Sequence, residues 1–170
     1  YYCGGMNQKA NISIEGNAGT GLGENMMSGT IHVKGNTSQS AGATAHGGNI
    51  IIDGDASSRC GISMKGVNII VKGSVGHMSA FMAQAGTLMI CGDAGEALGD
   101  SIYETVIYLA GKPKSLGVDC IEKKVTKNDL KKIENLIKIG NIKNVKPHDF
   151  KKFGSARKLY NFNIDNVSEY

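Results

Sequence analysis

The sequence has no tryptophan, and aromatic residues make up only 6% of its 170 residues. This composition suits a narrow interior filled by aliphatic side chains better than a broad core built on large rings. No run of 18 apolar residues occurs, so we expect no membrane-spanning helix. The four cysteines form no Cys-x-x-Cys pair and show no metal-site spacing, which favours reduced thiols and a cytoplasmic location.

Motifs for catalysis and ligand binding are also missing. The four histidines lie far apart, and none has a partner four residues away that would suit a metal ion. The glycine-rich stretch Gly19–Gly23 lacks the third glycine spacing of a nucleotide-binding motif. The aspartates do not recur about every nine residues, as calcium-binding β-rolls require. We therefore predict no catalytic, cofactor-binding or metal-binding residue in this chain.

A strict repeat governs the first two-thirds of the chain. Six glycines recur every 19 residues, and aliphatic residues stand two and four positions before each of them. The glycines are Gly16, Gly35, Gly54, Gly73, Gly92 and Gly111. A fixed period of about 20 residues with one short alternating strand per period predicts a solenoid. We therefore predict an all-β fold, a right-handed parallel β-helix with 19-residue turns, followed by a C-terminal helical extension.

Two domains are expected from this pattern. Residues 1–118 form the β-helix repeat domain, and residues 119–170 form a C-terminal helix and arm that pack on it. Gly4 stands 19 residues before Gly23, so the chain opens partway through a turn. Because a solenoid end exposes a strand edge that must be paired or capped, we expect further turns upstream.

The strand positions that point outward carry their own pattern. One column alternates in charge from Glu15 to Lys72, and we expect these charges to pair between neighbouring strands. The other column is largely apolar from Ile51 to Tyr108, and an exposed apolar stripe of this kind needs a cover. Either a helix formed by the tail or a partner subunit would cover this stripe, and the helix pattern of the tail favours the first.

The tail contains a clear helix pattern. Thr126 and Asp129 resemble a capping box, and Gly140 marks the expected end of the helix. Four aliphatic residues between them fall on one helical face: Leu130, Ile133, Leu136 and Ile137. A second, short helix is expected around Phe150 and Phe153, followed by an irregular arm.

Charge is distributed unevenly along the chain. Residues 1–111 carry 5 basic and 8 acidic side chains, whereas residues 112–170 carry 14 basic and 7 acidic ones. A basic tail can indicate nucleic-acid binding. Its lysines are scattered among acidic residues, and clusters of aromatic and arginine side chains are missing. We therefore expect a solvated lysine-rich surface and no nucleic-acid partner.

One turn departs from the repeat. Ala80 replaces a glycine of a second periodic column, and bulky side chains stand where other turns carry smaller or polar residues. Two interpretations stay open, a different internal filling of this turn or a contact ridge for another subunit. The candidate subunit-contact residues are His77, Met78, Phe81 and Met82 in this turn, with Arg157 and Tyr160 in the tail.

The tandem glycine turns, of which Gly16, Gly19, Gly23 and Gly29 form the clearest set, resemble the C-terminal β-helix domain of the glutamate synthase large subunit. This resemblance covers residues 1 to about 118. More specific stretches are residues 4–6, 23–26, 43–48, 76–80, 91–98 and 154–162, the last of which contains the Ser-Ala-Arg-Lys-Leu-Tyr-Asn-Phe segment at 155–162. They resemble the free-standing version of the domain, the small glutamate-synthase-like subunit of N-methylglutamate synthase. A similar domain occurs in the C subunit of formylmethanofuran dehydrogenase.

The resemblance implies a non-catalytic scaffold role in a hetero-oligomer. In such enzymes a glutaminase-like amidotransferase subunit and an FMN-binding subunit with an iron–sulfur cluster carry the chemistry, and the β-helix holds them together. FMN and the iron–sulfur cluster are therefore expected in partner subunits and not in this chain. Two alternatives stay open: the C subunit of a formylmethanofuran dehydrogenase, and an autonomous protein-binding module whose basic tail captures an anionic partner.

Overall fold

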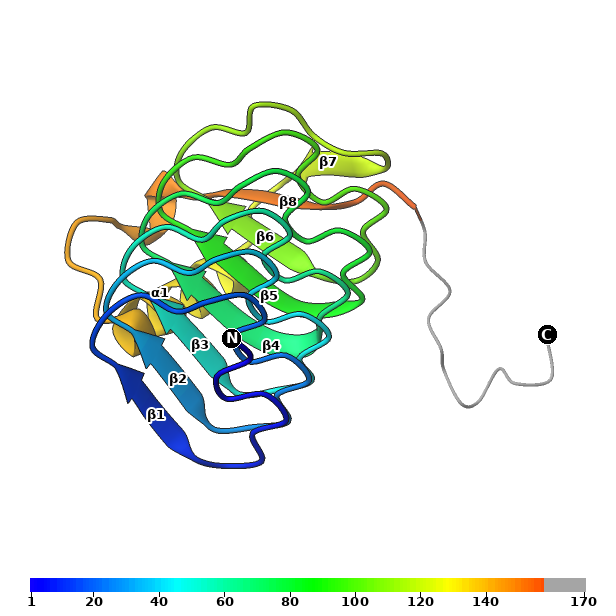
Figure 1. The fold of residues 1–170 in the computed structure, drawn as a ribbon. Coiled ribbons are helices and arrows are strands. Elements are labelled where there is room, and N and C mark those ends of the chain that lie inside the picture. Colours follow the sequence, from blue (N-terminus) through cyan, green and yellow to red (C-terminus); the bar gives the residue numbers. More distant parts are fainter. Residues whose placement is uncertain (158–170) are drawn as a thin grey trace, which may run out of the picture.

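The chain winds into a parallel β-solenoid in the computed structural model, which describes residues 1–157 (Figure 1). Successive turns each contribute one strand to a common sheet. The strands are β1 (Asn11–Ile14), β2 (Thr30–Val33), β3 (Asn49–Ile52), β4 (Lys65–Val71), β5 (Ala85–Ile90) and β6 (Val106–Leu109). Equivalent residues pair one turn apart, so Ile31 lies beside Ile50 and Ile50 beside Ile69. The predicted parallel β-helix with 19-residue turns is confirmed.

The interior of the solenoid is filled by aliphatic columns. Ile31 and Ile50 are fully buried, and so are Val33 and Ile52 in the column two residues later. Each side chain stacks on its copy in the next turn, and each large aliphatic residue contributes about 1.5–3 kcal/mol by leaving water. Within residues 1–157 the interior cluster contains one aromatic residue, Phe153, in keeping with the low aromatic content of the sequence.

Before its strand, each turn has a backbone segment in which every second residue has a positive φ. We call this segment the left-handed wall. In the turn before β5, Met78, Ala80 and Met82 have φ values of 53°, 58° and 49°. The amides of Met78 and Met82 donate to the following turn at 2.8 and 2.9 Å, whereas that of Ala80 donates to the preceding turn at 2.8 Å. A left-handed backbone costs a non-glycine residue about 1–2 kcal/mol. In the other described turns the middle of the three positions is glycine, which avoids this cost.

Helix α1 (Lys127–Gly140) lies against the outer face of the sheet, on the side away from the solenoid interior (Figure 1). Its residues Ile133 and Leu136 pack on the apolar stripe that runs from Ile51 to Tyr108. The stripe is buried beneath them, so the predicted helical cover is confirmed. Within residues 1–157, no helix is both long and apolar enough to cross a membrane.

The sequence predicted the start of α1 correctly but not its end. The capping box of Thr126 and Asp129 is present as predicted. At the other end, Asn141 takes the left-handed conformation at φ 50°, and Gly140 stays in the last helical turn. A Cβ on Gly140 would lie 3.1 Å from both Ile70 and Ile142, so this glycine allows close packing on the sheet and does not end the helix.

Two antiparallel strands close the end of the solenoid. Strand β8 (Lys151–Ser155) pairs with β6 on one side and with β7 (Cys120–Lys123) on the other. The expected short helix around Phe150 and Phe153 is wrong, because only the 3-10 turn η1 (Pro147–Asp149) is helical. The edge of β6 offers unpaired backbone groups that bind β8, and this pairing overrides the local helix pattern. Phe153 thereby closes the aliphatic interior.

The charged column on the outer face of the sheet pairs only in part. Lys72 Nζ lies 2.7 Å from Asp53 Oδ1, as expected for neighbouring strands. The same oxygen is 2.9 Å from His32 Nε2, which comes from the other outward column. Within residues 1–157 no ion pair joins Glu15 or Lys34, so the expected continuous ladder of charges is wrong. His32 approaches Asp53 diagonally and takes the place expected for Lys34.

Candidate functional site

The irregular turn presents its bulky side chains outward. His77 and Met82 are exposed, and Met78 and Phe81 are half-buried. None of the four belongs to the interior cluster, which at this turn is filled by smaller residues such as Ala80 and Ala83. The interior of this turn differs as well, because the buried Ser79 and Ala80 stand where the preceding turn has Cys60 and Gly61. Contact of the four residues with another subunit stays a prediction.

An apolar patch extends from this turn to its neighbours along the left-handed wall. We define the apolar wall patch as Ile62, Met78, Phe81, Met82 and Tyr103. Its members lie on three successive turns, which are joined by Ser63 N to Phe81 O at 2.8 Å and by Tyr103 N to Ala83 O at 2.9 Å. Met82 and Tyr103 are each 40% exposed. Methionine and aromatic side chains are enriched at protein interfaces, so the composition of this patch suits a contact surface.

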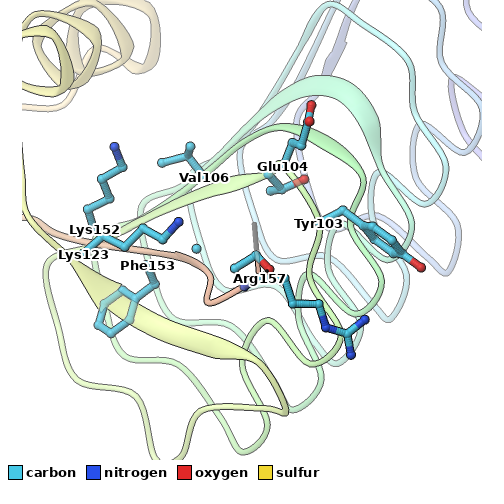
Figure 2. A pocket seen from close by; sticks show the side chains of 10 residues that line it. Tyr103, Glu104, Val106, Lys123, Lys152, Phe153 and Arg157 are labelled. Carbon is cyan, nitrogen blue, oxygen red and sulfur yellow. Dashed lines mark hydrogen bonds between the residues drawn. The ribbon is translucent and has the colours of Figure 1, made fainter. Parts of the chain in front are cut away.

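Arg157 lies near the C-terminal end of the left-handed wall. The amide of Ala156 donates to Asp119 O at 2.7 Å, and the Arg157 guanidinium forms an ion pair with the Asp119 carboxylate. Arg157 and Tyr103 line one cavity of about 260 Å³ (Figure 2). The structure therefore places Arg157 beside the turn that carries Tyr103. Tyr160, the remaining candidate contact residue, lies outside the described residues.

The cavity itself has mixed electrostatic character. Three cationic side chains line it, together with Glu104. Two of the cations are already paired, Lys152 with Asp129 and Arg157 with Asp119. Only Lys123 among the three has no ion pair within residues 1–157, and the same residues hold no group of three potential metal ligands. Among the described residues the cavity therefore offers one unpaired cation, Lys123, beside the carboxylate of Glu104.

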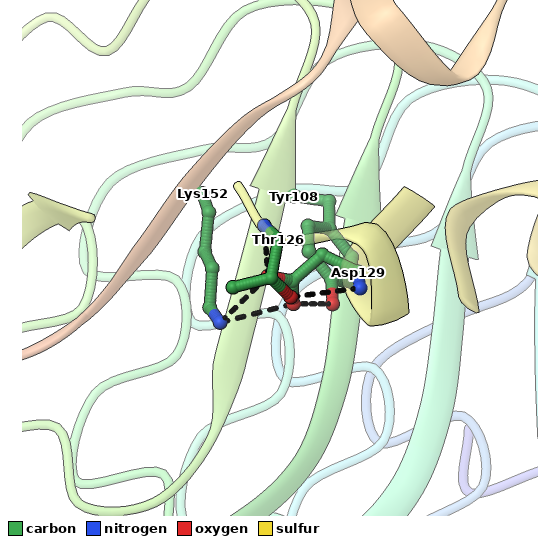
Figure 3. Close-up of polar contacts among 4 residues, drawn as sticks. All are labelled: Tyr108, Thr126, Asp129 and Lys152. Carbon is green, nitrogen blue, oxygen red and sulfur yellow. Dashed lines mark hydrogen bonds and ion pairs between the residues drawn. The ribbon is translucent and has the colours of Figure 1, made fainter. Parts of the chain in front are cut away.

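A buried polar cluster joins three elements of the fold (Figure 3). The Tyr108 hydroxyl of β6 donates to Asp129 Oδ1 of α1 at 2.7 Å. Lys152 Nζ of β8 lies 2.9 Å from the same oxygen. The backbone amide and the hydroxyl of Thr126 donate to Asp129 Oδ2 at 2.8 and 2.7 Å. One carboxylate thus caps the helix and ties it to both the sheet and the closing strand.

The environment of this cluster keeps Asp129 charged and Tyr108 neutral. Burial by itself would raise the pKa of Asp129, but hydrogen bonds from Thr126, Tyr108 and Lys152 outweigh it and hold the pKa well below its ordinary value. Burial and the neighbouring Asp129 carboxylate together raise the pKa of Tyr108. Both groups keep one protonation state near neutral pH, so the cluster suits a structural role and not proton transfer.

Three cysteines are similarly protected. Burial raises the pKa of Cys60 to about 12 and the pKa values of Cys91 and Cys120 to about 11. A thiol is an effective nucleophile only as its thiolate, so these three side chains are unsuited to catalysis near neutral pH. Cys60 belongs to the buried interior cluster. The sequence did not indicate the meeting of Tyr108, Asp129 and Lys152, because these residues come from distant elements.

Comparison with known proteins places these features in context. No model of a known protein family matches the chain. The chain is 55% identical over all 170 residues to Protein GlxC of Rhizobium meliloti (strain 1021), and it covers 75% of that protein. Identity at this level over the whole chain covers both the repeated turns and the tail. The name of that relative states neither an activity nor a ligand.

Proposed function

Because the chain belongs to the family of Protein GlxC, we propose that it is a glutamate-synthase-related subunit that holds other subunits together. The glycine turns support this proposal through their resemblance to the β-helix domain of glutamate synthase. The single observation that carries it is the exposed apolar wall patch on an otherwise regular solenoid. Solenoids commonly act through extended surfaces of this kind.

The complex that fits the sequence best is N-methylglutamate synthase, which converts methylamine and glutamate to N-methylglutamate and ammonia. Its expected partners are a glutaminase-like amidotransferase subunit and an FMN-binding glutamate-synthase-like subunit with an iron–sulfur cluster. In this proposal the chain contributes no catalytic residue and binds no cofactor. Support comes from the resemblance of the irregular turn and of the segment at 155–162 to the free-standing subunit.

The apolar wall patch is the proposed contact surface for one of these partners. The Tyr103 ring and the Met82 side chain, each 40% exposed, lose apolar contact with water when a partner covers them. His77 and Arg157 at the margins would supply the polar rim that interfaces usually have. In interfaces of this kind, with an apolar centre and a polar rim, a few central residues usually contribute most of the binding energy.

The proposal is tested by purifying the chain from its native source and identifying the bound chains and flavin. Met82→Glu should weaken retention of the partners by about tenfold or more, because it places a charge in the apolar patch. Gln8→Glu is a matched control, since Gln8 is exposed and lies several turns away from the patch, where it adds the same charge. A chain that purifies only as a monomer contradicts the proposal, and co-purification with pterin-enzyme subunits would assign it to the formylmethanofuran dehydrogenase type.

A further inference from the structure

The described part of the tail concentrates positive charge on the outside of the molecule. Residues 119–157 contain ten lysines and one arginine against five acidic residues, whereas residues 1–118 contain seven basic and eight acidic residues. Lys152 and Arg157 form ion pairs with Asp129 and Asp119 and so are neutralised. The other nine lysines are all exposed, and only three acidic residues of the segment remain to balance them.

Helix α1 presents several of these lysines on one side. Its buried positions Asp129, Ile133, Leu136 and Gly140 define the face that meets the sheet. Successive helical residues are rotated by about 100°, so Lys127, Lys131 and Lys138 fall on the opposite side. Of these three, only Lys138 forms an ion pair within residues 1–157, with Glu134 on the same side of the helix. We call the outward side of α1, with its neighbour Lys132, the lysine face.

The lysine face opposes the stability of its own helix. Lys127 occupies the first helical position, directly after the N-cap Thr126, where the helix dipole disfavours a positive charge. Lys127 and Lys131 are also four residues apart, a spacing at which like charges repel. A solvated face has no need of this arrangement, and glutamate at position 127 would remove both penalties. Sequences that break a local rule in this way do so most often at functional sites.

We infer that the lysine face is a docking surface for an acidic surface of a partner protein. The inference deepens the proposed scaffold role and rests on it. Helix α1 covers the outer face of the sheet, whereas the apolar wall patch lies on the turn segments before the strands, so the two surfaces are distinct and the chain could hold two partners at once. Protein is favoured over nucleic acid because residues 127–138 contain no arginine and no aromatic side chain for stacking on bases.

The substitution Lys127→Glu separates docking from folding. It should raise the melting temperature by about 2–4 °C, because it complements the helix dipole and creates a favourable pair with Lys131. It should also weaken binding of a poly-L-glutamate peptide by about fivefold at low salt. Lys34→Glu is the matched control, since Lys34 is exposed on the outer sheet face and has no ion pair within the described residues.

Each outcome decides the inference. Greater stability together with weaker peptide binding supports it, whereas equal losses in Lys127→Glu and Lys34→Glu show a general charge effect and overturn it. Duplex DNA that binds more tightly than the peptide and loses affinity in Lys127→Glu overturns it in favour of a nucleic-acid partner.

The assembled complex provides the decisive measurement. Carbodiimide cross-linking, which joins a lysine directly to a contacting carboxylate, should link Lys127, Lys131 or Lys132 to a co-purified subunit. A stable complex in which these lysines form no cross-links and remain as reactive toward an amine-labelling reagent as in the isolated chain overturns the inference and leaves the scaffold role intact. Failure to find any complex contradicts the scaffold role instead, and the peptide measurement then decides the inference for the isolated chain.

Discussion

The solenoid turns and the tail are held together in different ways. In residues 1–118 the same contacts recur every 19 residues, so each turn is stabilised by its two neighbours. In residues 119–157 the attachments are made once, by the pairing of β8 with β6, by one apolar cluster and by the carboxylate of Asp129. A defect in one turn should therefore affect mainly the adjacent turns, whereas a defect at Asp129 should affect the whole tail.

The largest effect is expected from Gly48→Ala in the solenoid. Gly48 has φ 83°, and a Cβ there would overlap the carbonyl oxygen of Gly29 in the preceding turn. Backbone strain and the forced separation of two turns should lower the free energy of unfolding by about 4 kcal/mol. Chemical denaturation measures the loss, and hydrogen exchange should show it concentrated around β2 and β3.

Gly16→Ala is the control for this substitution. A Cβ at Gly16 meets no atom within 4 Å, so the free energy of unfolding should change by less than about 0.5 kcal/mol. Similar losses in the two variants would show that the loss in Gly48→Ala does not come from the close stacking of turns.

Asp129→Ala should destabilise the protein somewhat less than Gly48→Ala, and its effect should lie in the tail and not in the solenoid turns. It leaves Lys152 without its anionic partner and the buried Tyr108 hydroxyl without its acceptor. The free energy of unfolding should fall by about 3 kcal/mol. Hydrogen exchange should increase across α1 and β8, while the interior strands β2 and β3 keep their protection.

Asp149→Ala serves as the control in the tail. Asp149 accepts a hydrogen bond from the Lys146 amide at 2.7 Å but lies on the surface, so its loss should cost only about 1 kcal/mol. Uniform faster exchange through the solenoid in Asp129→Ala would mean that the tail and the turns unfold as one unit.

The smallest effect is a loss of stability in acid. The pKa of Asp129 is lowered in the folded protein, so its contribution is complete above the unfolded pKa of about 3.9 and declines as pH falls below it. About 1 kcal/mol should be lost by pH 3. Thermal unfolding followed between pH 3 and 6 measures this loss, and Asp129→Asn should remove most of it. An unchanged acid dependence in Asp129→Asn would assign the effect to other carboxylates.

The solenoid could be predicted because its information is local and repeated. Ile31, Ile50 and Ile69 occupy equivalent positions, and stacking them requires only that each turn have the same length. The helical cover was also predictable, since an apolar stripe ending at Tyr108 needed burial and the tail carried an amphipathic segment. The closing strand was not, because Phe150 and Phe153 take their conformation from the free edge of β6.

The candidate contact surface was indicated only in outline. Bulky residues such as Met78 and Met82 stood out against the repeat, but the pattern could not tell an inward from an outward direction. Burial settled this, since neither residue belongs to the interior cluster and Met82 is 40% exposed. Ile62 and Tyr103 were missed because each looks ordinary within its own turn.

Periodicity alone was enough to establish the turn length, the two aliphatic columns and their vertical register, because identical turns stack in essentially one way. The contacts of Asp129 with Tyr108 and Lys152 depended on the folded chain. These contacts are made once, between residues far apart in the sequence. A sequence repeat does not indicate such contacts, because only the packing of the folded chain brings these residues together.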